Sequence, residues 1–163
     1  MKPITTSLMH ELSHRAVVSV RGRSNFNLHP QLSDPVQRFL NAIEPGSYVR
    51  PHRHGNPPRW ELFVVRHGAA VILLLDDDGV VDERVELDTG GAVRAAEIPA
   101  GVWHTVVARA PGTVLFEFKE GPYAPLSDKD FAAWAPTEGD PMCPHWVRRF
   151  LAAMPGSRLA DYR

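Results

Sequence analysis

Three histidines and one glutamate have the types and spacing of ligands for a divalent metal ion. His52 and His54 are separated by one residue in an extended segment, and alternate side chains of an extended chain point to the same face. Glu61 follows a Gly-Asn-Pro-Pro turn, so a hairpin would bring its carboxylate beside both imidazoles. His104 opens a later strand after another turn. Converging imidazoles and a carboxylate would bind iron(II), nickel, zinc or manganese.

Side-chain alternation adds two candidates next to this site. If the chain is regular over Ser47–His54, Tyr48 and Arg50 face the same way as the two histidines. Arg50 would either pair with a carboxylate such as Glu61 or clamp a phosphate or carboxylate of a substrate. Tyr48 would either donate a proton or pack in the core with its hydroxyl bonded.

A third group of candidates precedes the metal motif. Asn25, Asn27 and His29 alternate with Phe26 and Leu28, so an extended chain would have one polar face and one apolar face. Three polar groups in a row suit the hydroxyl groups of a sugar. The alternative is that this segment is an exposed edge strand or loop.

Composition narrows the class of protein. The chain has 163 residues, which fits one domain, and a net charge of −1. Such a balance argues against binding nucleic acid or membranes through basic residues. Cys143 is the single cysteine, and the longest apolar run has seven residues, far short of the ~20 that span a membrane. With no signal peptide in the sequence, we expect a soluble cytoplasmic protein.

The elements that position these residues are mostly short strands. Helical periodicity predicts helices over Thr5–Val20, Asp34–Ile43 and Pro144–Met154. Between them, β-branched and aromatic runs punctuated by Gly, Pro and Asp-Gly predict seven strands. These are Ser47–Pro51, Trp60–Arg66, Ala69–Asp76, Val80–Leu87, Ala95–Ile98, His104–Ala108 and Thr113–Lys119.

The spacing of the strands predicts a mainly antiparallel sandwich or small barrel. No helix-length segment separates them, so parallel pairing is not expected. Ala69–Leu75 is apolar at every position, so both of its faces must be covered. One cover is the barrel core, and the other is either the chain's own helices or a second copy. We expect a homodimer.

The ordered motifs resemble those of the cupin superfamily. The first reads Gly46, five residues, His52-Arg53-His54, six residues, Glu61, six residues and Gly68. The second reads Pro99-Ala100-Gly101-Val102-Trp103-His104. The hairpin before Glu61 is longer than in the family, and the glycine expected before the second motif is displaced to Gly91. The resemblance implies a single cupin double-stranded β-helix, or jelly-roll barrel, with short terminal helices. It implies metal binding by His52, His54, Glu61 and His104.

Within that fold the chain divides into three parts. Residues 1–46 would form the N-terminal helices and an extended segment, 47–119 the cupin barrel, and 120–163 a strap and the C-terminal helix. A narrower similarity, to the WbuC-type cupin metalloproteins, covers most of the chain. It is carried by Asn25–His29, Asp34–Arg38, Tyr48–His54 and Asp128–Phe131. These small bacterial cupins are often associated with gene clusters for O-antigen or other surface polysaccharides.

Three functions remain open from the sequence. The first is a metal-dependent isomerase or epimerase on a small sugar-like or anionic substrate, with the metal as Lewis acid and Tyr48, His29 or Glu61 moving a proton. The second is an iron(II) dioxygenase, because four ligands leave two positions open on an octahedral ion. The third is a non-catalytic domain that binds a sugar or metal and reports it to a partner.

Overall fold

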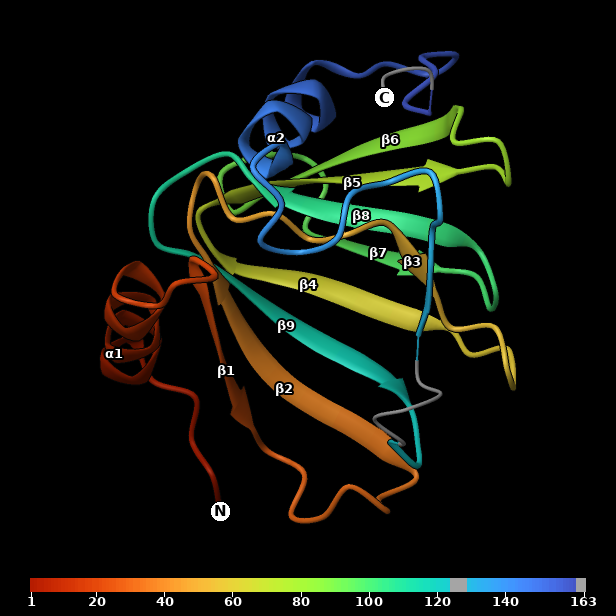
Figure 1. The fold of residues 1–163 in the computed structure, drawn as a ribbon. Helices are drawn as coiled ribbons and strands as arrows, with labels where there is room; N and C mark the ends of the chain where they lie inside the picture. The colour runs from red at the N-terminus through yellow and green to blue at the C-terminus, as the bar shows by residue number, and fades with distance from the viewer. Residues whose placement is uncertain (124–128, 161–163) are drawn as a thin grey trace.

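Two antiparallel five-stranded sheets face each other (Figure 1) in the computed structural model, which describes residues 1–123 and 129–160. In the first sheet the strand order is β1 (Arg23–Asn27), β2 (Val36–Ile43), β9 (Thr113–Glu120), β4 (Glu61–His67) and β7 (Ala95–Ile98). In the second it is β10 (Asp130–Phe131), β3 (His52–Arg53), β8 (Trp103–Ala108), β5 (Ala69–Leu75) and β6 (Val81–Asp88). This is a cupin-type jelly roll, mainly β, so the predicted fold class is confirmed.

Helix α1 (Thr6–Val17) covers the outer face of the first sheet (Figure 1). The side chain of Thr5 caps the helix by accepting from the backbone N–H of Leu8. Leu12 and Ala16 are buried against Leu40, Ala42 and Val114 of the sheet. The apolar side chains on the outer face of this sheet are therefore buried beneath the helix.

Helix α2 (Cys143–Ala152) covers the second sheet in the same way. Trp146 and Phe150 pack over Val71, Leu73 and Val107. The outer face of β5 is thus covered by the chain itself, so this strand does not require a second copy, and the homodimer stays a prediction. Among the described residues, no helix combines the length and apolarity that crossing a membrane would need.

The predicted helix over Asp34–Ile43 is wrong, because these residues form β2, which pairs with β1 and β9. Apolar residues at i, i+3, i+4 and i+7 also fit a strand that is buried on both faces. In β2, Leu40 and Ala42 lie under α1, whereas Ile43 faces the core between the sheets. The barrel consequently starts at Arg23 and not at Ser47.

Other boundaries also differ from the prediction. Residues 47–51 are not a strand; regular pairing begins at His52. Helix α1 ends three residues earlier than expected, and α2 spans Cys143–Ala152. The strap is described over 129–142, where Asp130 and Phe131 extend the second sheet and Ala132 and Ala135 are buried. Asp128, part of one sequence motif, lies outside the described residues.

Removing the side chain that joins α2 to the sheet should destabilise the fold. Phe150 is fully buried, edge-on to Trp146 and stacked on Tyr48. We expect Phe150→Ala to lower the free energy of unfolding by about 3–5 kcal/mol in urea denaturation. Met154→Ala, a control at a side chain that is 58% exposed, should change it little. Equal effects of the two substitutions would show that α2 does not hold the sheet.

Candidate metal centre and its cavity

The four predicted ligands meet in the structure. The ligand atoms of His52, His54, Glu61 and His104 all lie within 4.8 Å of one another, and all four residues are buried. His52 and His104 are register partners on β3 and β8 of the second sheet. Glu61 is the first residue of β4 and faces them from the first sheet. The site therefore joins the two sheets.

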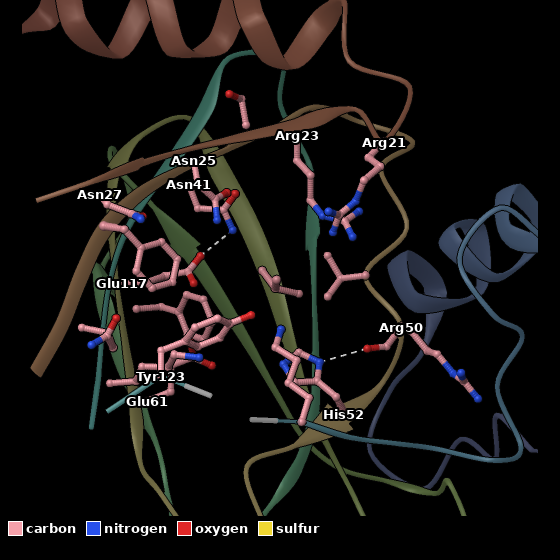
Figure 2. A pocket seen from close by; sticks show the side chains of 18 of the residues that line it. Arg21, Arg23, Asn25, Asn27, Asn41, Arg50, His52, Glu61, Glu117 and Tyr123 are labelled. Carbon is pink, nitrogen blue, oxygen red and sulfur yellow. Dashed lines mark hydrogen bonds between the residues drawn. The ribbon is translucent and has the colours of Figure 1, made fainter. Parts of the chain in front are cut away.

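Backbone carbonyls orient two of the imidazoles. Nδ1 of His52 lies 2.9 Å from the carbonyl oxygen of Arg50, and Nδ1 of His104 lies 2.9 Å from that of Val102 (the His52 bond is drawn in Figure 2). A carbonyl oxygen only accepts, so each Nδ1 carries a proton and Nε2 is the nitrogen left to bind a metal. This is how proteins fix histidines that bind a metal.

The cluster needs a positive charge at its centre. Oε2 of Glu61 lies 3.2 Å from Nε2 of His104 and 3.4 Å from Nε2 of His54. Two acceptors so close repel each other unless a proton or a metal ion lies between them. Burial alone would raise the pKa of Glu61, but the neighbouring His104 and His54 outweigh burial and hold it well below the usual range. The donor set of three imidazoles and one carboxylate fits a divalent metal ion.

His52 is suited to be a ligand at neutral pH. Burial, followed by the positive charge of Lys129 and the nearby His104, holds the pKa of His52 well below its usual value. The ring is therefore neutral, and its Nε2 lone pair is available to a metal.

The metal cluster opens into a cavity of about 580 Å³, shown in Figure 2. His52 and Glu61 form one part of its wall. Among the charged lining residues, five are Arg or Lys and three are Glu: Arg21, Arg23, Arg50, Lys119, Lys129, Glu61, Glu117 and Glu138. Glu138 forms ion pairs with Arg21 and Arg23 at the edge. The cavity favours a polar ligand with negative charge.

His29 presents a buried ring nitrogen to this cavity. The carbonyl oxygen of Arg38 already accepts from the backbone N–H groups of Leu28 and His29. The N–H of Arg38 in turn points at Nδ1 of His29, 3.1 Å away. The same Nδ1 also lies 3.0 Å from the carbonyl oxygen of Arg38, so the backbone of Arg38 engages this ring nitrogen. The buried Nε2 has no partner among the described residues, so it is available to a bound molecule.

The structure places the other polar candidates differently. Asn25 and Asn27 line the cavity from β1, which is an edge strand of the first sheet, and both residues are exposed. Arg50 also contributes to the wall, but its side chain points away from the metal cluster (Figure 2). Its Nη2 donates to the carbonyl oxygen of Ala132, and its guanidinium lies over the ring of Phe131.

The prediction that Tyr48 shares the face of His52 is wrong. The hydroxyl of Tyr48 donates to the carbonyl oxygen of Pro136, and its ring stacks on Phe150 beneath α2. Val49, its neighbour, lines the cavity instead. Strand alternation fails here because residues 47–51 are irregular.

Sequence reasoning missed several polar residues that line the cavity, and those on β9 and β2 are the most informative. Lys119 and Glu117 project from β9, and Asn41 from β2. In β9, Val114 and Phe116 pack toward α1 on the outer face of the sheet. The charged face is therefore the inner one. The alternation of apolar and polar residues in β9 is visible in the sequence. Assigning the polar face to the interior required knowing that a helix covers the apolar face.

Comparisons with known proteins agree with this fold. CapF, a capsular polysaccharide assembling protein from Staphylococcus aureus, superimposes with a TM-score of 0.56 at 24% identity over 70% of this chain and 30% of CapF. KdgF from Halomonas sp. gives 0.50 at 18% identity over 66% and 84% of the two chains. A variant of the oxalate decarboxylase OxdC from Bacillus subtilis gives 0.51 at 17% identity over 69% and 28%. These similarities show the fold alone, a jelly roll of the cupin type.

The chain belongs to the DUF6016 family, a domain of unknown function, whose model matches residues 4–87. The matched part runs from the start of α1 to β6 and contains three of the four clustered residues. A search of curated proteins finds no match. The similar part spans about a third of the CapF chain, which is much longer.

Loss of one imidazole should weaken metal binding without unfolding the chain. We expect His52→Ala and His104→Ala each to weaken Ni²⁺ binding by more than about 100-fold in calorimetric titrations, because direct ligands matter more than their supporting residues. Circular dichroism should show an unchanged fold. His10→Ala, at an exposed histidine on α1, should bind as the unmodified chain does. Full metal retention in both cluster variants would refute the site.

Proposed function

We propose that this protein is a metal-dependent enzyme that acts on a small, anionic, carbohydrate-like substrate, as an isomerase or epimerase. The observation that carries the proposal is the buried His₃Glu cluster at the wall of a polar, cation-rich cavity. A purely structural metal site would be closed, whereas this one borders space for a small molecule.

The cluster and the cavity would have separate tasks. His52, His54, Glu61 and His104 would hold the metal ion, which when bound supplies Lewis-acid polarisation of a carbonyl or hydroxyl oxygen. The cation-rich wall would hold the negative group of the substrate. Nε2 of His29 and the amides of Asn25 and Asn27 would bind its hydroxyl groups.

A role in surface-polysaccharide metabolism is part of this proposal. CapF is a capsular polysaccharide assembling protein, and the WbuC-type motifs of this sequence point in the same direction. The similarity to CapF establishes the fold alone, and the carbohydrate class is favoured by the polar lining of the cavity. The homodimer expected from the sequence belongs to the proposal as well.

Identification of the metal separates this function from its main alternative. We expect protein purified without an affinity tag or chelator to contain one divalent ion per chain by elemental analysis. Zinc, nickel or manganese would exclude an iron(II) dioxygenase. Iron together with substrate-dependent oxygen uptake would overturn the isomerase proposal.

A thermal-shift screen tests the substrate class. Sugar phosphates and nucleotide sugars should raise the melting temperature, because ligands that bind only the folded chain stabilise it by about 2.7 kcal/mol at 100 times Kd. Neutral sugars should raise the melting temperature less. The effect should be reduced in Lys119→Met, which removes one cation from the cavity wall. Equal shifts with neutral and anionic sugars would contradict an anionic substrate.

A further inference from the structure

Glu117 is a buried carboxyl group that lines the cavity and is not one of the four clustered residues. It is 5% exposed and lines the cavity from the inner face of β9. In the first sheet it is the register partner of Phe63 on β4, and Lys119 is the partner of Glu61. Glu117 is thus the diagonal neighbour of the metal-cluster residue Glu61. Such neighbours lie about 7–8 Å apart, which leaves room for a small molecule to contact both.

One side-chain amide holds the Glu117 carboxyl in place. Nδ2 of Asn41 on β2 donates to Oε1 of Glu117 over 2.6 Å, as Figure 2 shows. Oδ1 of Asn41 is buried with no partner among the described residues. The pair therefore presents to the cavity an unused acceptor beside a carboxyl group. A molecule that contains hydroxyl groups would satisfy both.

The charges around Glu117 are mixed. Glu61 faces it from β4, Lys119 lies on its own strand, Lys129 precedes β10, and Arg23 projects from β1. Burial and then the negative charge of Glu61 raise the pKa of Glu117 to about 8, against the hydrogen bond from Asn41 and the charges of Lys129 and Lys119. A carboxyl group of this kind can both give and take a proton near neutral pH.

We propose that Glu117 is the catalytic residue that transfers protons to and from the substrate in this cavity. The inference rests on the proposed function and names the group that performs its proton transfer. Of the residues first considered, Tyr48 is sequestered under α2 and Glu61 belongs to the metal cluster. Glu117 is held by Asn41 on the cavity wall, one diagonal step from that cluster.

The step needs no added oxidant or reductant. Ionised Glu117 takes a proton from a carbon next to the substrate's carbonyl group. The C–H bond breaks, an O–H bond forms on the carboxyl group, and the C–H electron pair moves toward the carbonyl. Glu117 then returns the proton to the former carbonyl carbon, the proton of the adjacent hydroxyl group passes to the former carbonyl oxygen, and a new carbonyl group forms on the carbon that lost its hydrogen. These transfers complete an isomerisation.

Glu117→Gln is the sharpest variant for testing this role. Glutamine keeps an oxygen that accepts from Asn41 and an N–H₂ in place of the acid O–H, but it cannot exchange a proton with the substrate. Glu120→Gln makes the same change three residues along β9, outside the cavity lining, and serves as the control.

The first measurement is independent of activity. The folded chain holds the proton of Glu117 up to about pH 8, whereas an unfolded glutamate loses it near 4.5. The ionisable group therefore destabilises the fold increasingly as pH rises between these values. Glu117→Gln should melt above the unmodified chain, by a margin that grows from pH 5 to pH 8, and Glu120→Gln should show no such trend. A margin that is constant with pH would overturn the proposal.

The second measurement follows proton transfer directly. Chain loaded with Ni²⁺ is incubated in D₂O with fructose 6-phosphate or glucose 6-phosphate, and NMR detects deuterium at carbon. We expect Glu117→Gln to bind Ni²⁺ and keep the thermal shifts, yet to lose exchange by about 100-fold or more. Exchange at the unmodified rate in this variant would overturn the role of Glu117 alone. No exchange by the unmodified chain with any probe would overturn the proposed function and this role together.

Discussion

Three imidazoles and a carboxylate packed within 4.8 Å of one another form an arrangement that is stable only around a positive charge. Hydrogen bonds from Nδ1 to the carbonyl oxygens of Arg50 and Val102 turn the Nε2 lone pairs of His52 and His104 inward. The carboxylate of Glu61 faces them from the opposite sheet. Contacts within this centre therefore help to fix the position of the two sheets relative to each other, and with it the shape of the adjacent cavity.

The polar interior depends on apolar packing outside the barrel. In the first sheet, Leu40, Ala42 and Val114 are buried under α1. The inner face of the same strands can then carry Asn41 and Glu117 without loss of the core. In the second sheet, α2 covers the outer face of β5 in the same manner. A jelly roll with a polar cavity buries less apolar surface between its sheets. Each helix adds buried apolar surface on the outside of a sheet.

The clustering of the four candidate ligands was predictable because short motifs with fixed spacing determine their positions locally. His52 and His54 share a face through alternation, and Gly and Pro residues mark the turns before Glu61 and His104. Prediction failed where a long-range contact decides the outcome. The β2 pattern fits a helix or a strand buried on both faces, and only its pairing with β1 and β9 distinguishes them. Tyr48 was misplaced because the irregular chain before His52 does not alternate. Glu117 was missed because the position of α1 decides which face of β9 is the outer one.

The central claim is that these four side chains together bind one metal ion. X-ray absorption spectroscopy of the metal-loaded chain tests it most directly, because it reports the atoms bonded to the metal and the scattering of imidazole rings. The account predicts nitrogen and oxygen ligands at about 2.0–2.2 Å, with the signature of three imidazoles in the unmodified chain and two in His104→Ala. A sulfur ligand from Cys143, or a spectrum unchanged by His104→Ala, would contradict it.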